Sequence, residues 1–290
     1  MKFWQSLAFA EPEQLVEIAR IAESVGFEGV LLSDHVFFPE RLASPYLYSP
    51  DGKPGFDAAS PFPEPWAAVA AMAAVTSRLR FATNVYVLPL RHPLEVAKAT
   101  ATAFVLSRGR VALGAGAGWM REEFDALGVD FASRGRRFDE AIGVLRALWR
   151  GGMVEHHGEF FNFPRLAISP APQRPLPIWV GGLSAPALRR AARLGDGWLG
   201  TGQTPAEAEA VLARLARLRA EAGRAAQPFE AIVPLTTPPD RDVLRRLEDH
   251  GATGTVSFPF TYTVGPASPL EKKRAYLEGF AERVIARMRA

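Results

Sequence analysis

The chain has 290 residues, of which 48% are hydrophobic and 22% charged, with 34 basic and 31 acidic side chains. This balance is ordinary for a globular protein, shows no clustered basic surface of the kind that binds nucleic acid, and leaves no apolar run long enough to span a bilayer. The lack of cysteine excludes disulfides and thiol chemistry, and the N-terminus has no secretory signal pattern, so we expect a cytoplasmic protein without a nucleic-acid or membrane partner.

Short apolar runs alternate with amphipathic segments along the chain, which is typical of parallel strands joined by helices. The strands are predicted at residues 2–8, 29–32, 79–88, 111–115, 177–180, 197–199, 229–234 and 254–257. The helices are predicted at 12–25, 66–76, 93–106, 136–150, 185–194, 205–222, 240–250 and 270–289. Eight such units favour one domain over residues 1–290, a (β/α)8 TIM barrel, and the alternative is a doubly wound open sheet.

Two long segments interrupt this alternation. Residues 38–65 follow the second strand and are rich in proline, glycine and aromatic side chains, which favours an ordered lid over the barrel mouth rather than a disordered linker. Residues 151–176 precede the fifth strand, and their segment 154–161 predicts a small hairpin that turns at Gly158.

The fourth strand ends in alternating glycines, Gly114, Gly116 and Gly118, before Trp119. Bare backbone at a strand end permits a large flat molecule to approach closely, so we predict that Gly116 and Gly118 bind a cofactor. The spacing is not that of a Rossmann dinucleotide loop, because no helix follows at the required place.

The other predicted strand ends carry little reactive chemistry. The pair Asp34–His35 stands alone there, without a Schiff-base lysine, a second facing carboxylate or a cluster of metal ligands. A bound organic cofactor would then supply the chemistry, and we expect no metal. His35 is placed to move a proton at the mouth, and the alternative is a structural, hydrogen-bonded histidine.

A second candidate binding element lies after the fifth strand. Gly181, Gly182, Leu183 and Ser184 lead into a helix whose first amides are free to bind an anion, with Ser184 as the cap. The alternative is an ordinary capped turn. The charged residues at 121–123 and 134–140 are interpreted as an ion-pair network that holds a loop against a helix.

Several motifs together make the chain resemble the luciferase-like monooxygenase superfamily, and within it the oxidoreductases that depend on the deazaflavin coenzyme F420. The similarity extends over nearly the whole chain. The matching segments are Ser33-Asp34-His35-Val36, residues 45–54, Leu88-Pro89-Leu90-Arg91-His92-Pro93, 113–128 with 134–137, Ile178-Trp179-Val180-Gly181-Gly182 and Gly195-Asp196-Gly197-Trp198.

The resemblance implies roles for individual residues. It implies a non-prolyl cis peptide at Asn84–Val85 beneath the middle ring of the cofactor, a cofactor contact at Asp34, and a proton donor at His35. The loop of Gly181, Gly182, Leu183 and Ser184 would hold the phosphate-bearing tail of the cofactor. The resemblance also implies a homodimer.

One departure from the resemblance bears on the substrate. The branch that oxidises sugar phosphates has a glutamate where this chain has Trp119, and no equivalent lysine clamp is present. Trp119, Phe37 and the aromatic lid instead predict a pocket for an apolar or aromatic substrate.

These observations predict an enzyme that transfers a hydride between reduced coenzyme F420 and a small organic substrate. The first alternative is a monooxygenase that uses FMN reduced by a separate reductase. The second alternative is a non-catalytic flavin-binding protein.

Overall fold

The computed structural model describes residues 1–289. Its strands are β1 (Lys2–Ser6), β2 (Gly29–Leu32), β3 (Arg80–Thr83), β4 (Tyr86–Val87), β5 (Val111–Gly116), β6 (Val154–His157), β7 (Asn162–Leu166), β8 (Ile178–Gly181), β9 (Gly197–Leu199), β10 (Glu230–Pro234) and β11 (Gly254–Ser257). Its helices are α1 (Leu15–Ser24), α2 (Pro65–Ala74), α3 (Pro93–Leu106), α4 (Arg121–Ala126), α5 (Arg134–Trp149), α6 (Ala185–Leu194), α7 (Pro205–Glu221), α8 (Arg241–Asp249), α9 (Leu270–Phe280) and α10 (Ala286–Arg289), with a π-helical turn at Ala281–Ile285 between the last two.

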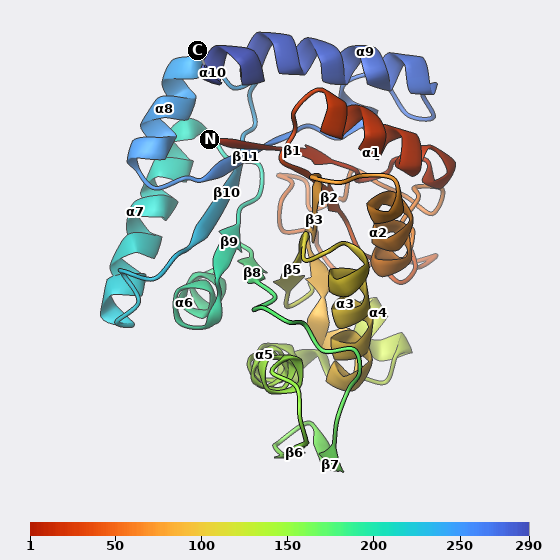
Figure 1. The fold of residues 1–290 in the computed structure, drawn as a ribbon, viewed down its shortest axis with the longest axis vertical. Helices are drawn as coiled ribbons and strands as arrows, with labels where there is room; N and C mark the ends of the chain where they lie inside the picture. Colours follow the sequence, from red (N-terminus) through yellow and green to blue (C-terminus); the bar gives the residue numbers. More distant parts are fainter. Residues whose placement is uncertain (290) are drawn as a thin grey trace.

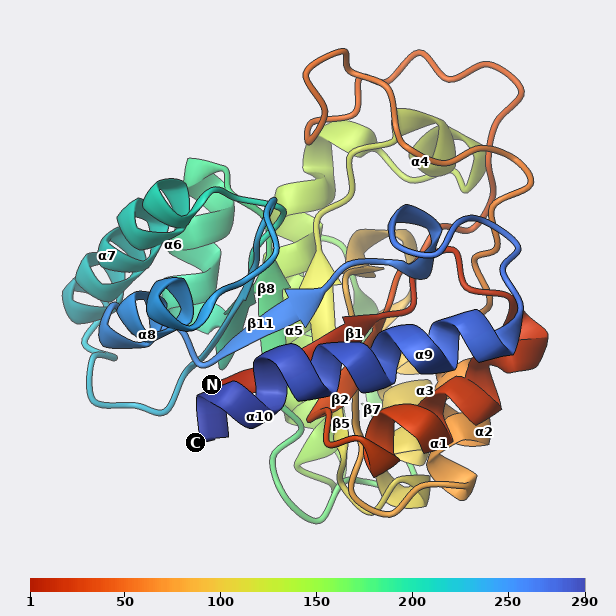
Figure 2. The same ribbon diagram turned by 90° about the horizontal axis from the view of Figure 1, so that it is seen from above.

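The parallel strands form a closed barrel surrounded by helices (Figures 1 and 2). Their order is β3-β2-β1-β11-β10-β9-β8-β5, and β3 pairs with β5 through Phe81 opposite Val111, which completes the ring. β4 continues the third strand and pairs with β5 as well. The predicted (β/α)8 barrel is therefore confirmed, and the open-sheet alternative is wrong.

One side chain from each barrel strand contributes to a single internal layer. This layer consists of Trp4, Leu31, Ala82, Ala112, Trp179, Leu199, Ile232 and Val256, and Val85 packs against it. The two tryptophan rings meet edge to face at 5.3 Å, and the layer also contains two small alanines, so large and small side chains fill the barrel together. The barrel is thus filled by side chains at this layer, which leaves no room for a ligand there.

Local sequence signals explain where several helices begin. The Ser184 hydroxyl caps α6, and Thr204 and Glu207 form a reciprocal capping box at α7. The Glu64 carboxylate accepts the amide of Ala67 at the start of α2, where proline is the first helical residue. These caps satisfy amides that have no partner within their own helix.

The structure also differs from the sequence-based elements in three places. The third strand is divided in two by a bulge at Asn84–Val85, α4 was not predicted, and the C-terminal helix contains the π-helical turn. An antiparallel hairpin is present and its first strand, β6, and the turn after it lie in the predicted segment 154–161, but its second strand, β7, lies beyond that segment, at Asn162–Leu166.

The expected lid was residues 38–65, of which Pro65 begins α2; residues 38–64 contain neither helix nor strand and lie beside α4 at one end of the barrel (Figure 2). The amides of Ala43 and Ser44 donate to Glu122 Oε1 at 2.7 and 3.0 Å, and the Tyr262 hydroxyl donates to the carbonyl of Gly55 at 3.1 Å. The lid is therefore attached to α4 on one side and to the segment after β11 on the other. Within residues 1–289, no helix combines the length and apolar character needed to cross a membrane.

Candidate active site

A backbone bulge forms the floor of the barrel mouth. The peptide bond Asn84–Val85 is cis, as the resemblance implied, and both residues are partly exposed. A Cβ built on Gly116 would lie 2.4 Å from Val85 Cγ2, and one built on Gly181 would lie 2.4 Å from Val85 Cγ1. Real side chains cannot approach so closely, so these glycines make room for Val85, and the floor is its apolar side chain rather than bare backbone.

Gly118 has a different local role. Its φ of +83° belongs to the left-handed region, and an added Cβ would lie 2.7 Å from Val87 Cγ1 and 2.8 Å from Phe124 Cε2. Only glycine fits this turn between β5 and α4 without strain. The space beside Gly116 and Gly118 is thus occupied by protein side chains, and a direct cofactor contact at either residue stays a prediction.

Asp34 is buried at the end of β2, with its carboxylate fully engaged. Its two oxygens accept from Arg91 at 2.7 and 2.8 Å, and Oδ2 also accepts the amide of Val87 at 2.9 Å. Burial raises the pKa of the Asp34 carboxyl, while the Arg91 guanidinium and the Val87 amide oppose that rise. Asp34 therefore ties β2 to β4 below the mouth, and its contact with a cofactor stays a prediction.

The loop before α6 presents unpaired amides. Ser184 Oγ accepts the amide of Ala187 at 3.3 Å, which confirms the predicted cap, and Gly182 has a φ of +111°. Among residues 1–289, the amides of Leu183, Ser184 and Ala185 have no hydrogen-bond acceptor. Successive free amides at the start of a ten-residue helix suit a phosphate or a carboxylate. This cradle and the apolar floor at Val85 fit a flat cofactor with an anionic arm.

His35 is held in place by a carboxylate that the sequence analysis did not select. Its Nδ1 lies 3.0 Å from Glu123 Oε2, and Glu123 Oε1 accepts the amide of Val36 at 2.7 Å. The side chain of Glu123 is 1% exposed and that of His35 is 11% exposed. Nε2 of His35 makes no hydrogen bond to any described residue and is not among the enclosed polar atoms, so it is the free nitrogen of the ring.

Aromatic rings surround His35 on several sides. Phe62 and Trp119 meet the imidazole edge to face, with centroids at 5.1 and 5.8 Å, and Phe56 lies at 5.2 Å. Tyr46 continues the cluster, with its ring centroid 5.0 Å from that of Trp119. Burial raises the pKa of Tyr46 to about 12, so its hydroxyl stays neutral in ordinary buffers. Trp119 thus lies against His35, and its place in a substrate pocket stays a prediction.

Two sequence-based expectations, for Phe37 and for the charged cluster at 121–123 and 134–140, are confirmed only in part or not tested by the structure. Phe37 is partly buried but has no ring contact with His35, so its place in a substrate pocket stays a prediction. Glu122 and Glu123 hold the segment after β2 through backbone amides and His35. The ion pairs expected of the cluster are found at 134–140, where Arg136 pairs with Glu159 and Asp139 with Arg190. Arginines of the cluster also stack on aromatic rings, as Arg134 does over Phe131 at 3.8 Å.

The sequence analysis missed Glu123, Arg91 and the lid residues Phe56 and Phe62. Arg91 belongs to a segment that carried the resemblance, so it was within reach of that comparison. Glu123 also lies in a matching segment, 113–128, but nothing in that segment marked it as a partner of His35, which lies 88 positions away in the sequence.

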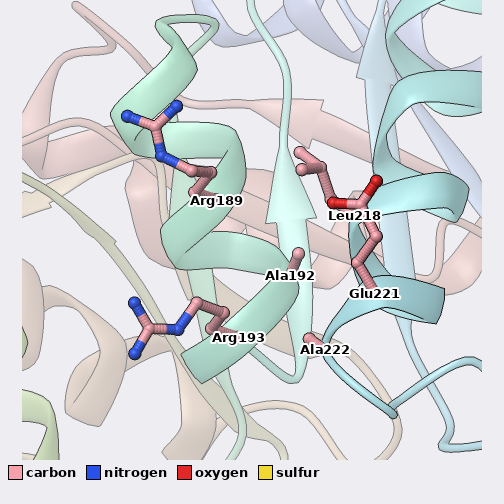
Figure 3. Close-up of a pocket in the computed structure, with 6 residues that line it drawn as sticks. All are labelled: Arg189, Ala192, Arg193, Leu218, Glu221 and Ala222. Carbon is pink, nitrogen blue, oxygen red and sulfur yellow. The ribbon is translucent and has the colours of Figure 1, made fainter.

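A hollow also lies elsewhere, in a surface groove of about 310 Å³ between α6 and α7 (Figure 3). In this view Arg189 and Arg193 extend from α6 away from Leu218 and Glu221 of α7. Their charges do not converge on one position in the groove. The groove therefore lacks the arrangement of a ligand site, and the barrel mouth is the candidate active site.

The barrel mouth combines free amides that suit an anion, an apolar floor and an enclosed imidazole. These features are typical of an enzyme that binds a cofactor. The chain belongs to the luciferase-like monooxygenase family, whose model matches residues 4–282. It is 41% identical over 290 residues to an uncharacterised protein of Mycobacterium tuberculosis, covering 99% of this chain and 100% of that protein.

Two further likenesses concern proteins with stated activities. The chain is 32% identical over 269 residues to an F420-dependent glucose-6-phosphate dehydrogenase of Beutenbergia cavernae, covering 91% of this chain and 75% of the relative. The crystal structure of the monooxygenase RslO1 from Streptomyces bottropensis superposes with a TM-score of 0.79 at 20% identity, covering 99% of both chains. The second likeness concerns the fold alone. The family and the relative of Beutenbergia cavernae support an oxidoreductase.

Proposed function

We propose that the protein transfers a hydride between reduced coenzyme F420 and a small apolar or aromatic organic substrate. The observation that carries this proposal is the placement of His35, whose Nδ1 is bound by Glu123 while Nε2 stays free inside an aromatic enclosure at the barrel mouth. A structural histidine would be expected to use both ring nitrogens when it is this well buried.

The relative of Beutenbergia cavernae supports the choice of cofactor, because it is named as F420-dependent and aligns with most of this chain. The free amides of Leu183, Ser184 and Ala185 suit the phosphate-bearing arm of a deazaflavin. The Val85 side chain offers an apolar surface of the kind that a flat ring packs against. When bound, the cofactor would supply or accept the hydride.

The residues of the chain would handle the accompanying proton and the exclusion of water. Reduction of a carbonyl adds one hydride to its carbon and one proton to its oxygen, and protonated His35 would donate that proton from Nε2. In the reverse direction, neutral His35 would accept the hydroxyl proton at Nε2. The rings of Phe56, Phe62 and Trp119 would keep bulk water from this exchange.

The same rings support an apolar or aromatic substrate. They offer faces and edges for stacking and no charge for a phosphate, so we expect no turnover of glucose 6-phosphate despite the named activity of one relative. A homodimer is also part of this proposal, on the strength of the family alone.

A second candidate function is an FMN-dependent monooxygenase that receives reduced flavin from a separate reductase. The family description and the monooxygenase RslO1 favour it. The same cradle would then bind the single phosphate of FMN, and the aromatic enclosure would shield an oxygen reaction from water.

The experiment that tests the proposal is a spectroscopic titration of the purified protein with each cofactor, followed by stopped-flow mixing of the reduced form with air. We expect tight F420 binding, slow reaction with oxygen, and turnover with members of a panel of aldehydes, ketones, enones and alcohols. Preferred FMN binding with a rapid oxygen reaction would replace the first candidate by the second. Binding of either cofactor without turnover of any substrate would indicate a non-catalytic protein.

A further inference from the structure

Within residues 1–289, the buried carboxylate of Glu123 has no arginine or lysine partner. Its side-chain contacts are with His35 Nδ1 at 3.0 Å and with the amide of Val36 at 2.7 Å. Burying a charged group is costly unless hydrogen bonds compensate for its lost hydration. A carboxylate that is 1% exposed and shares its two oxygens between a histidine and the next residue's amide therefore needs an explanation beyond packing.

The contact has a direct consequence for the imidazole ring. A carboxylate can only accept hydrogen bonds, so Nδ1 of His35 must carry the hydrogen that lies toward Glu123. In neutral His35 the lone pair then sits on Nε2, and in protonated His35 Nε2 carries the second hydrogen. Nε2 is therefore the nitrogen that accepts a proton when His35 is neutral and donates one when His35 is protonated.

Glu123 also fixes the direction of the ring. One oxygen holds the imidazole and the other holds the backbone of Val36, so the side chain and the adjacent main chain are attached to the same group. Its neighbour Glu122 holds the amides of Ala43 and Ser44 in the lid. The short helix α4 thus secures the histidine and the lid that encloses it.

We propose that Glu123 is a positioning residue that selects the Nδ1–H form of His35 and so presents Nε2 to the substrate. This inference rests on the proposed function, in which His35 moves the proton. Glu123 itself does not need to touch substrate or cofactor.

The first test is nitrogen NMR of the imidazole side chains in the cofactor-free protein, with His35→Ala used to assign the His35 signals. We expect neutral His35 to show a protonated Nδ1 and an unprotonated Nε2. A wild-type spectrum with the hydrogen on Nε2 instead would overturn the proposal without the need for any Glu123 variant.

The second test is Glu123→Gln, which keeps the shape of the side chain but offers its amide as a donor to Nδ1. We expect the hydrogen to move to Nε2 in the NMR spectrum, and kcat to fall by about 10–100-fold, the range typical of groups that orient an active residue. KM for the cofactor should change little. Unchanged kcat together with the altered spectrum would overturn the positioning role.

The chain contains a matched control in a second glutamate–histidine pair. Glu140 Oε1 lies 3.0 Å from His156 Nε2, and Glu140 also accepts the amides of Phe160 and Phe161. Glu140→Gln should alter the spectrum of His156 and leave kcat unchanged. A comparable loss of kcat in this variant would show that the Glu123 effect is general destabilisation and would count against the proposal.

His35→Ala separates this inference from the proposed function. If His35→Ala leaves turnover intact, the proton role of His35 fails, and the proposed function must be revised. If His35→Ala lowers turnover while Glu123→Gln does not, the proposed function stands and only the role of Glu123 fails.

Discussion

Val85 occupies the space that a side chain on Gly116 would need, because a Cβ on that glycine would lie 2.4 Å from Val85 Cγ2. The two residues come from adjoining parts of the sheet, since β4 pairs with β5. The glycine-rich end of β5 is therefore explained first by the bulge that it accommodates. Any cofactor ring would then rest on Val85.

This relationship predicts a specific rescue. Gly116→Ala should lower the free energy of unfolding by about 1–3 kcal/mol, the usual cost of overpacking a tight site. Val85→Ala removes the Cγ2 methyl group that the new Cβ would meet, so adding it to Gly116→Ala should cost much less than the sum of the single changes. Denaturant unfolding of the two single variants and the double variant measures this coupling.

Gly143→Ala provides the control for that series. Gly143 lies in α5, and within residues 1–289 an added Cβ would meet nothing within 4 Å apart from the adjacent backbone of its own helix, so this change should stabilise the protein by about 0.5–1 kcal/mol. Additive effects of Gly116→Ala and Val85→Ala would contradict the packing described here.

The Asp34–Arg91 pair predicts a large effect on stability. Asp34→Asn keeps an acceptor for the Val87 amide but leaves the Arg91 guanidinium without its counter-charge in a site where the two side chains are 2% and 19% exposed. We expect a loss of about 3 kcal/mol in the free energy of unfolding. Thermal and denaturant unfolding measure it.

An exposed ion pair gives the comparison. Arg136 and Glu159 are 66% and 53% exposed, so Arg136→Gln should cost less than about 1 kcal/mol. Equal effects of Asp34→Asn and Arg136→Gln would show that Asp34 is not the tie between β2 and β4 that the contacts indicate.

The contacts of Glu122 predict how the lid responds to acid. Burial raises the pKa of the Glu122 carboxyl, but the hydrogen bonds from Ser44 and Ala43 outweigh it and bring the pKa below its ordinary value. Because the folded pKa is depressed, this contribution to stability is complete above about pH 4.3 and is lost as the pH falls through the lower folded value.

Hydrogen exchange of peptides that cover residues 38–49 measures this response. The wild-type lid should stay protected until the pH falls below the pKa of free glutamic acid. In Glu122→Gln the lid should exchange faster already at neutral pH. Glu23 makes analogous contacts with the amides of Ser77 and Leu79, so Glu23→Gln should change exchange there and leave the lid unaffected. Identical lid exchange in wild type and Glu122→Gln would refute this anchor.

The cap of α6 predicts an effect on cofactor affinity. Ser184→Ala removes the hydroxyl that orders the start of α6 and should cost about 1 kcal/mol of stability. If the anionic arm binds the adjacent amides, Kd for F420 should also rise. Thr204→Ala removes the corresponding cap of α7 and should affect stability alone. A rise in Kd of the same size for both variants would argue against this cradle.

Much of the fold follows from local sequence patterns. α3, α6, β2, β9 and β11 have the predicted bounds, because their apolar periodicity, prolines and caps act within a few residues. The bulge at Asn84–Val85, and with it the position of the Val85 side chain, could be predicted only from the resemblance. The apolar run from 79 to 88 by itself has the pattern of one continuous strand.

The rest of the site depends on contacts between distant segments. The six-residue helix α4 has no cap side chain and little periodicity, so nothing local marks Glu123 as a partner of His35. The rings of Phe56 and Phe62 reach His35 only because the lid folds back over the mouth. A single sequence contains no signal for such pairings.

A crystal structure of the protein grown with oxidised F420 tests the central claim most directly. We predict that the deazaflavin ring packs on Val85 and that its phosphate accepts hydrogen bonds from the amides of Leu183, Ser184 and Ala185. A cofactor bound away from Val85, or an arm that leaves those three amides free, would contradict the account.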